Sequence, residues 1–283
     1  MTELRLRTVD AFTDRAFTGN PAGVVVLTES PSPEWMAALA GELNLAETAF
    51  VLPEERPDAD YRLRWFTPAV EVDMCGHATL AAAHCLFADG VASPLRFATR
   101  SGILTVSTLA DGSLAMDFPA SPAAEIALSA ELAARLHSAL GARPTWVGRG
   151  GTDDLLVEVE DAQTVRQLAP DLSAVAEFEA RGIIVTAVSD AEEADFVSRF
   201  FGPRVGVLED PVTGSAHTVL APYWAAKLGK SELVGLQVSP RSGVVGVSLR
   251  GNRVQLTGRA VSILDARLAA AAGYRGGVAG GSA

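Results

Sequence analysis

Two segments in different halves of this sequence share a pattern that decides the fold. They read Gly76-His-Ala-Thr-Leu-Ala-Ala-Ala and Gly214-Ser-Ala-His-Thr-Val-Leu-Ala. Each is a glycine-containing turn that enters an apolar stretch, which is typical of the start of a buried helix. The spacing predicts helices over 76–87 and from 214 to about 228. Because strands are predicted on both sides of both helices, we interpret the chain as an internal duplication.

The flanking sequence predicts the other elements of the two halves. Ser32-Pro-Glu-Trp offers a Ser N-cap and a Pro at the first helical position, so a helix is predicted to run to about Leu43. A further helix is predicted over 130–140 and a short one over 165–168. Alternating and β-branched runs predict strands at 4–9, 24–27, 48–52, 61–66, 95–97, 102–109, 113–118, 145–148, 155–159, 182–188 and 194–201, with hairpin strands within 235–256. The strand over 194–201 is predicted to expose Arg199.

The segment Pro119-Ala-Ser-Pro-Ala-Ala is the best candidate for a boundary between two domains. A chain of 283 residues suits two domains of about 130–150 residues each. We therefore predict a first domain over residues 1–120 and a second over residues 121–283. C-terminal strands or a helix could pack back onto the first domain.

Composition limits the partners that the protein can have. Acidic residues outnumber basic ones by 34 to 23, for a formal net charge of −11, which argues against non-specific nucleic-acid binding but not against a small anionic substrate. No apolar run reaches the roughly 18–20 residues that span a bilayer, and the charged start does not resemble a secretory signal. Cys75 and Cys85, if they share one helix, lie roughly 15 Å apart, too far for a disulfide. We expect a cytoplasmic protein with reduced thiols and no membrane partner.

Both turn–helix junctions are candidate anion sites. A glycine turn that enters a helix exposes backbone N–H groups and the positive end of the helix dipole, which bind carboxylate or phosphate or stabilise an oxyanion. For either junction alone, the alternative is that the turn provides ordinary helix capping. The presence of two matched junctions in one chain makes this alternative weaker. Polar side chains stand at both: Cys75 and His77 at the first, and Asp210, Thr213, Ser215 and His217 at the second.

Three side chains of the first half are candidates for acid–base chemistry. Glu47 has apolar neighbours on both sides in the sequence, a setting that would raise its pKa as a general acid or base requires; the alternative is an exposed glutamate at a helix end. His77 beside a helix N-terminus is expected to be neutral, either as a proton shuttle or as a cap. Cys75 is either an activated thiol or a small buried residue.

Motifs for several other chemistries do not occur in the sequence. There is no GxGxxG after a strand, no Walker loop, no spaced Cys/His cluster for zinc and no GxSxG elbow. His84 and His217 are interpreted as structural. The remaining groups are carboxylates, imidazole and backbone donors, which favour proton transfer without a metal, nucleotide or flavin.

As a set, several segments resemble the phenazine-biosynthesis PhzF-like family, relatives of diaminopimelate epimerase. They follow the family order and extend over nearly the whole chain, from the N-terminus to about residue 225. The matching segments are Asp10-Ala-Phe-Thr, Gly19-Asn-Pro-Ala-Gly-Val, Asn44-Leu-Ala-Glu-Thr-Ala-Phe, Arg64-Trp-Phe-Thr-Pro, Cys75-Gly-His-Ala-Thr-Leu-Ala and Glu209-Asp-Pro-Val-Thr-Gly-Ser-Ala-His.

The resemblance implies an α+β fold of two pseudo-symmetric domains, each a curled, mostly antiparallel β-sheet or barrel around a central helix, commonly assembled as a homodimer. It implies a cofactor-independent isomerase with Glu47, His77 and Asp210 as catalytic residues. Such an enzyme takes a proton from one carbon of a small cyclic amino or hydroxy acid and returns it to another carbon on the same face. The substrate-binding positions that it implies are Asn20, Cys75, Gly76, Thr213, Gly214 and Ser215.

The epimerase relatives use two cysteines, one from each half. Cys75 matches the first, but Thr213 stands at the second position, and its hydroxyl cannot replace a thiol as a proton carrier near neutral pH. A Cys75-dependent racemase or epimerase with a non-thiol partner remains an alternative, as does a non-catalytic small-molecule-binding protein on the same scaffold. If the halves pack along one edge, both helix N-termini should face one deep, partly apolar cleft with Glu47 largely buried in its wall.

Overall fold

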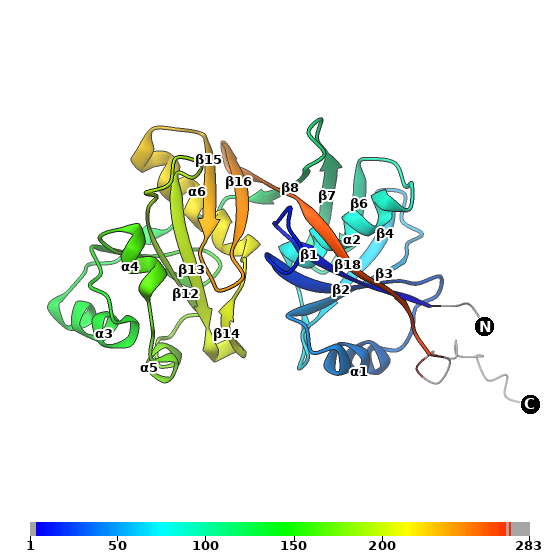
Figure 1. Ribbon diagram of the computed structural model, residues 1–283, viewed down its shortest axis with the longest axis horizontal. Coiled ribbons are helices and arrows are strands. Elements are labelled where there is room, and N and C mark those ends of the chain that lie inside the picture. The colour runs from blue at the N-terminus through cyan, green and yellow to red at the C-terminus, as the bar shows by residue number, and fades with distance from the viewer. Residues whose placement is uncertain (1–3, 270–271, 273–283) are drawn as a thin grey trace, which may run out of the picture.

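The computed structural model describes residues 4–269 and 272 and has two lobes side by side, joined at the centre of the molecule (Figure 1). The first half of the chain forms β1 (Arg5–Ala11), β2 (Asn20–Val26), α1 (Pro33–Leu43), β3 (Glu47–Pro53), β4 (Tyr61–Phe66), β5 (Glu71–Val72), α2 (Gly76–Ala88), β6 (Leu95–Thr99), β7 (Gly102–Thr108) and β8 (Leu114–Pro119). The second half forms β9 (Ala124–Glu125), α3 (Ala130–Leu140), β10 (Trp146–Arg149), β11 (Asp154–Glu158), α4 (Ala162–Gln167), α5 (Leu172–Ala176), β12 (Gly182–Val188), β13 (Phe196–Gly202), a 3₁₀ turn (Pro203–Val205), β14 (Val207–Asp210), α6 (Gly214–Leu228), β15 (Glu232–Gln237), β16 (Gly243–Arg250), β17 (Arg253–Gly258) and β18 (Ala260–Arg267).

The strand pairings repeat from one half to the other. In the first half, β2 and β3 are parallel, β3 and β4 antiparallel, β4 and β6 parallel, and β6, β7 and β8 form an antiparallel meander. In the second half, β11 and β12 are parallel, β12 and β13 antiparallel, β13 and β15 parallel, and β15, β16 and β17 form the matching meander. The α+β fold of two pseudo-symmetric halves is therefore confirmed.

Two strands lie outside this repeat, and the second of them, β18, crosses from the second half of the chain to the lobe of the first half. The short strand β9 pairs with β10, and β18 pairs with β1 over seven residues. Strands β8 and β17 pair with each other at the centre, so the strands of both lobes form one continuous sheet. The predicted hairpin region thus extends beyond residue 256, and its final strand lies in the lobe formed by the first half (Figure 1).

A central helix fills each lobe. Nine of the thirteen residues of α2 are buried, and they lie on every side of the helix. It packs against β1, β2, β3, β8 and β18, while α6 packs against β11, β15, β16 and β17. Because alanine dominates α2, the surrounding sheet can approach the helix closely. Helix α1 begins as predicted, with Ser32 as N-cap and Pro33 at the first position.

The prediction that Arg199 is exposed is wrong. Its side chain is only 9 % exposed, and it forms a bidentate ion pair with Glu209 at 2.7 and 2.8 Å. A third hydrogen bond runs to the carbonyl of Leu168 at 2.7 Å. Alternation along β13 could not reveal this, because the short helices α4 and α5 cover the face of the strand that would otherwise meet solvent.

Within residues 4–269 and 272, no helix combines the length and apolar character that a crossing of the membrane requires.

Candidate active site at the junction of the lobes

Helices α2 and α6 begin at the same point between the lobes. A methyl group added to Gly76 would lie 3.4 Å from the Cα of Gly214, and one added to Gly214 would lie 3.3 Å from the Cα of Gly76. A side chain at either position would therefore press on the backbone of the other half. The structure brings both predicted junctions together, with their positive helix ends adjacent.

The residues before these two helices do not cap them. Neither Cys75 nor Thr213 accepts a side-chain hydrogen bond from the first turn of its helix. The N-cap side chains of α1, α3, α4 and α5 all do so. The side chains of Cys75 and Thr213 therefore do not provide the N-cap that the other four helices have, although the backbone N–H of Ala78 acts on the Cys75 thiol and lowers its pKa. First-turn N–H groups that no side chain caps are available to a ligand.

Glu47 begins β3 and lies against the start of α2. Its side chain is 16 % exposed, and its Oε2 lies 3.3 Å from Nε2 of His77. Burial, and after it the negative charge of Asp210, raises the pKa of Glu47 from 4.5 to about 8, against the opposing effect of a hydrogen bond with Cys75. The structure thus favours the desolvated carboxyl over the exposed glutamate, and this carboxyl is protonated at neutral pH.

His77 lies in the first turn of α2 with a side chain that is 4 % exposed. Burial lowers its pKa from 6.5 to about 3, so the ring is neutral. Its Nδ1 lies 3.1 Å from Nδ2 of Asn20 and 3.4 Å from Sγ of Cys75. Because the two amide hydrogens of Asn20 go to Asp210 and to the carbonyl of Val212, the Cys75 S–H is the donor to Nδ1. We therefore assign Nδ1 as acceptor and place the ring proton on Nε2, which faces Glu47. Among the described residues, Nε2 has no aligned hydrogen-bond partner.

Asp210 brings a second carboxyl to the junction from the other half of the chain. Its Oδ1 accepts a hydrogen bond from Asn20 at 2.7 Å, and its Oδ2 accepts one from Thr213 at 2.6 Å. Burial raises the pKa of Asp210 from 3.8 to about 6, although both hydrogen bonds oppose the rise. The pKa values of Glu47 and Asp210 are thus both raised, and the negative charge of Asp210 opposes ionisation of Glu47, so the two carboxyl groups resist carrying charge at the same time.

Two buried amides hold this arrangement in place. Asn20, already bound to Asp210, also donates to the carbonyl of Val212 at 2.9 Å, which fixes the orientation of its amide. Gln237 donates to the carbonyl of Asp210 at 2.8 Å and accepts from the N–H of Thr213 at 2.8 Å. Gln237 was not among the residues predicted from the sequence, where its signal was an amide at an inward position of a predicted strand.

The Cys75 thiol is buried and protonated. Burial, and then the charge of Glu47, raises the pKa of Cys75 well above its usual value. Among the described residues, Glu47, Cys75 and His77 are the three whose ligand atoms lie close enough, within 4.8 Å of one another, to hold a metal ion together. These atoms already contact one another, and a metal would require the buried thiol to ionise.

Ser215, in the first turn of α6, contacts Arg181, a residue that no sequence pattern singled out. Its Oγ accepts a hydrogen bond from Nη2 of Arg181 at 3.0 Å. Arg181 also lowers the pKa of both Glu47 and Asp210, so its charge reaches the carboxyl pair. His217 and His84, which were interpreted as structural residues, have partners of their own. His217 Nδ1 lies 2.8 Å from the carbonyl oxygen of Thr213, and His84 Nε2 lies 3.0 Å from Oγ of Ser262.

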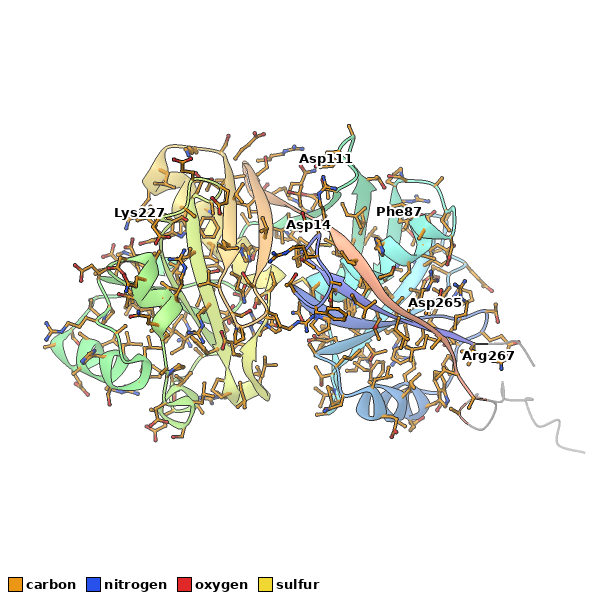
Figure 2. All side chains as sticks on the ribbon, in the orientation of Figure 1. Asp14, Phe87, Asp111, Lys227, Asp265 and Arg267 are labelled. Atoms are coloured by element: carbon orange, nitrogen blue, oxygen red, sulfur yellow. The ribbon has the colours of Figure 1, made fainter. Side chains whose placement is uncertain are left out.

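Two cavities lie away from this cluster. One of about 390 Å³ is lined by residues that include Asp14, Asp111 and Arg241, and Figure 2 shows the first two beside the junction of the lobes. The other, of about 730 Å³, is lined by Tyr61 and Pro94 among others. None of the predicted site residues lines either cavity. The predicted site residues instead contact one another closely, and the deep cleft expected around them is neither of these cavities.

The fold and the site together define a class: pseudo-symmetric α+β proteins that gather acid–base side chains between two helix N-termini. The family of phenazine biosynthesis-like proteins, PhzC-PhzF, matches residues 9–266. The chain belongs to this family, which confirms the resemblance seen in the sequence.

Several relatives are similar over nearly their whole length. An uncharacterized isomerase of Pseudomonas aeruginosa is 50% identical, with 94% of this chain and 99% of that protein covered. An uncharacterized isomerase of Halalkalibacterium halodurans is 47% identical, with 92% and 96% covered. The crystal structure of a PhzF-family phenazine biosynthesis protein from Enterococcus faecalis superimposes with a TM-score of 0.87 at 37% identity, covering 95% of this chain and 100% of that one.

A more distant structure shares the fold alone. A probable proline racemase from Agrobacterium radiobacter superimposes with a TM-score of 0.63 at 13% identity, with 94% of this chain and 93% of that one covered.

Proposed function

We propose that this protein is a cofactor-independent isomerase that moves a proton within a small cyclic amino or hydroxy acid. The observation that carries the proposal is the buried cluster at the two helix starts: Glu47 Oε2 lies 3.3 Å from Nε2 of His77, and Nδ2 of Asn20 lies 3.1 Å from Nδ1 of His77 and 2.7 Å from Oδ1 of Asp210. Burial raises the pKa of both carboxyl groups and lowers the pKa of His77. Paired carboxyl groups with separated pKa values are suited to general acid–base work. The isomerase names of the relatives from Pseudomonas aeruginosa and Halalkalibacterium halodurans support the same class of reaction.

In the proposed mechanism, Glu47 carries the transferred proton. Its protonated carboxyl gives a proton to one carbon of an enol or enamine, forming a C–H bond. The resulting carboxylate then removes a proton from a second carbon on the same face, so the enzyme ends as it began. The Nε2–H of His77, 3.3 Å from Glu47, would stabilise the carboxylate between the two steps.

Asp210 has a complementary role in this mechanism. As a carboxylate held by Asn20 and Thr213, it keeps Glu47 protonated and can accept a hydrogen bond from an amino or hydroxyl group of the substrate. The free N–H groups of α2 and α6 would bind the acidic group of the substrate.

Homodimer formation, which the family resemblance implied, stays a prediction that light scattering would test.

The two alternatives have less support. A Cys75-dependent racemase would need a thiolate, whereas burial raises the pKa of this thiol, and Thr213 offers no second thiol. A non-catalytic binding protein would have no use for a protonated Glu47, whose burial as a carboxylate costs stability.

Solvent exchange tests the proposed function. Protein dialysed exhaustively against a chelator would be incubated in D₂O with a panel of small cyclic amino and hydroxy acids, and mass spectrometry would detect deuterium gained at carbon. We expect exchange with at least one such acid, and its loss in Glu47→Gln. The exposed Glu55, in the loop after β3, gives the control variant Glu55→Gln, which should keep the activity. Exchange that persists in Glu47→Gln would refute the mechanism.

A further inference from the structure

Each central helix is preceded by a short lead-in segment, residues 71–75 before α2 and residues 209–213 before α6, and both segments begin with a glutamate. Glu71 stands five residues before Gly76, the first residue of α2. Glu209 stands five residues before Gly214, the first residue of α6. Both glutamate side chains are largely buried, so each carboxylate needs a partner.

An arginine on a neighbouring strand binds each of these glutamates in the same way. Nε and Nη2 of Arg64 donate to the two carboxylate oxygens of Glu71, both at 2.7 Å. The same two atoms of Arg199 donate to Glu209 at 2.7 and 2.8 Å. Each guanidinium also lies over the aromatic ring two residues further along its strand, 5.2 and 4.9 Å from the ring centroids. A bidentate pair of this kind fixes the geometry of both side chains.

The strand register places the two arginines at equivalent positions. Arg64 in β4 lies opposite Phe50, the fourth residue of β3. Arg199 in β13 lies opposite Val185, the fourth residue of β12. The arginine–glutamate pair is therefore part of the internal duplication.

A second anchor of the lead-in segments is repeated as well. The carbonyl of Asp73, the third residue of the first segment, accepts a hydrogen bond from Oγ of Ser101 at 2.7 Å. The carbonyl of Pro211, the third residue of the second segment, accepts one from Oγ of Ser239 at 2.8 Å. The two serines lie in equivalent turns, between β6 and β7 and between β15 and β16. Each segment is thus held at its first and third residues.

The reacting groups, by contrast, differ between the halves. Cys75 and His77 stand where the second half has Thr213 and Ser215, and the residue that corresponds to Asp210 is a valine. A buried ion pair is weak evidence for stability alone, because apolar residues can replace it without loss of stability. Two identical pairs beneath different reacting groups instead indicate a shared requirement for geometry.

We propose that the pairs Arg64–Glu71 and Arg199–Glu209 are positioning clamps, each of which holds a lead-in segment so that its reacting groups meet at the junction of the lobes. The first clamp positions the start of α2, and the second positions Asp210. A displacement of about 1 Å in a reacting group can lower a rate about a hundredfold. This inference rests on the proposed function for the chemistry of these groups and adds which residues place them.

Backbone hydrogen exchange in D₂O tests the clamps without a substrate, with mass spectrometry of peptides that cover each lead-in segment. Arg64→Lys and Arg199→Lys keep the positive charge but cannot form the bidentate pair. Each should raise exchange about tenfold or more in its own segment and leave the other segment as in the wild type. A pair that only stabilised the fold would instead change exchange throughout its lobe.

The two thiols of the chain give a second readout along a single helix. Cys75 precedes α2, Cys85 lies within it, and both are buried. In Arg64→Lys, iodoacetamide should modify Cys75 about tenfold or more faster than in the wild type, while Cys85 stays protected. Arg199→Lys should leave both rates unchanged, because its clamp holds the other segment.

Further variants keep the test interpretable. Arg62 on β4 and Arg166 on α4 are exposed arginines that also form ion pairs, so Arg62→Lys and Arg166→Lys are the matched controls and should behave as the wild type. Glu71→Gln and Glu209→Gln remove the carboxylate of each pair and should loosen the same segments. They test the clamps from the other side where a lysine variant fails to fold.

The rate of the reaction completes the test. With every cyclic acid that exchanges deuterium at carbon in the wild type, both lysine variants should lower the rate about tenfold or more, and both controls should keep it. The inference is overturned if the folded lysine variants leave their own segments unchanged, if exchange rises equally in both segments, or if a segment loosens while the rate at carbon stays that of the wild type. The proposed function fails separately, through the absence of exchange at carbon or an active Glu47→Gln, and backbone exchange and alkylation still test the clamps in that case.

Discussion

Replacing Glu47 by glutamine should stabilise the protein while it abolishes activity, and the stabilisation should depend on pH. A carboxyl whose pKa is raised on folding favours the folded state fully only below its ordinary pKa, and that advantage is lost as the pH rises to the folded-state pKa. For Glu47 the loss runs from pH 4.5 to about pH 8. Glutamine is neutral throughout, so it suffers no such loss.

The magnitude follows from the same pKa. Each pH unit above the ordinary pKa costs about 1.4 kcal/mol until the folded-state pKa is reached. At pH 7, about 2.5 pH units above 4.5, the unfolding free energy of Glu47→Gln should exceed that of the wild type by about 3 kcal/mol. The difference should shrink towards zero near pH 4.5 and be largest at pH 8 and above.

Urea unfolding at several pH values between 5 and 8 measures this difference. The four tryptophans supply a fluorescence signal from both lobes, and Glu55→Gln, at an exposed position, is the control that should stay within about 0.5 kcal/mol of the wild type. A stability difference for Glu47→Gln that is flat across this range would mean that Glu47 titrates as an ordinary exposed glutamate, and the argument for a buried acid would be wrong.

Three further predictions follow from the same geometry. The kcat/KM should be bell-shaped in pH, falling below about pH 6 as Asp210 becomes protonated and above about pH 8 as Glu47 ionises; a profile flat from pH 5 to 9 would contradict the raised pKa values of this pair. Cys75→Ser should lower the rate less than about tenfold, and iodoacetamide should inactivate the wild type slowly because the thiol is buried and protonated; rapid inactivation that substrate prevents would favour the thiol-dependent epimerase. Gly214→Ala puts a Cβ 3.3 Å from the Cα of Gly76, so kcat should fall about tenfold or more through displaced helix ends with little change in Tm, and an unchanged kcat would show that this close approach does not matter.

Local sequence patterns were enough to predict much of the secondary structure, the repeated fold and the family. The helix from Pro33 was predictable because a serine cap and a proline at the first position fix a helix start. The two glycine turns predicted the central helices because an apolar, alanine-rich run can only be buried in the middle of a lobe. Repetition of these elements predicted the pseudo-symmetric fold, and the motif segments predicted the family.

Tertiary structure alone decided which side chains share an environment. The sequence left Glu47 open between an exposed and a buried position, because desolvation depends on α2 and on Asp210 from the other half. Arg199 was predicted as exposed because nothing along β13 shows that α4 and α5 cover it. Arg181 gave no signal, since its partner Asp154 and its contact with Ser215 are distant in the chain. The spacing of apolar residues shows which face of a single helix or strand is buried. The burial of a charged side chain, its pKa and its ion-pair partner arise only when elements that are distant in the sequence meet in the folded protein.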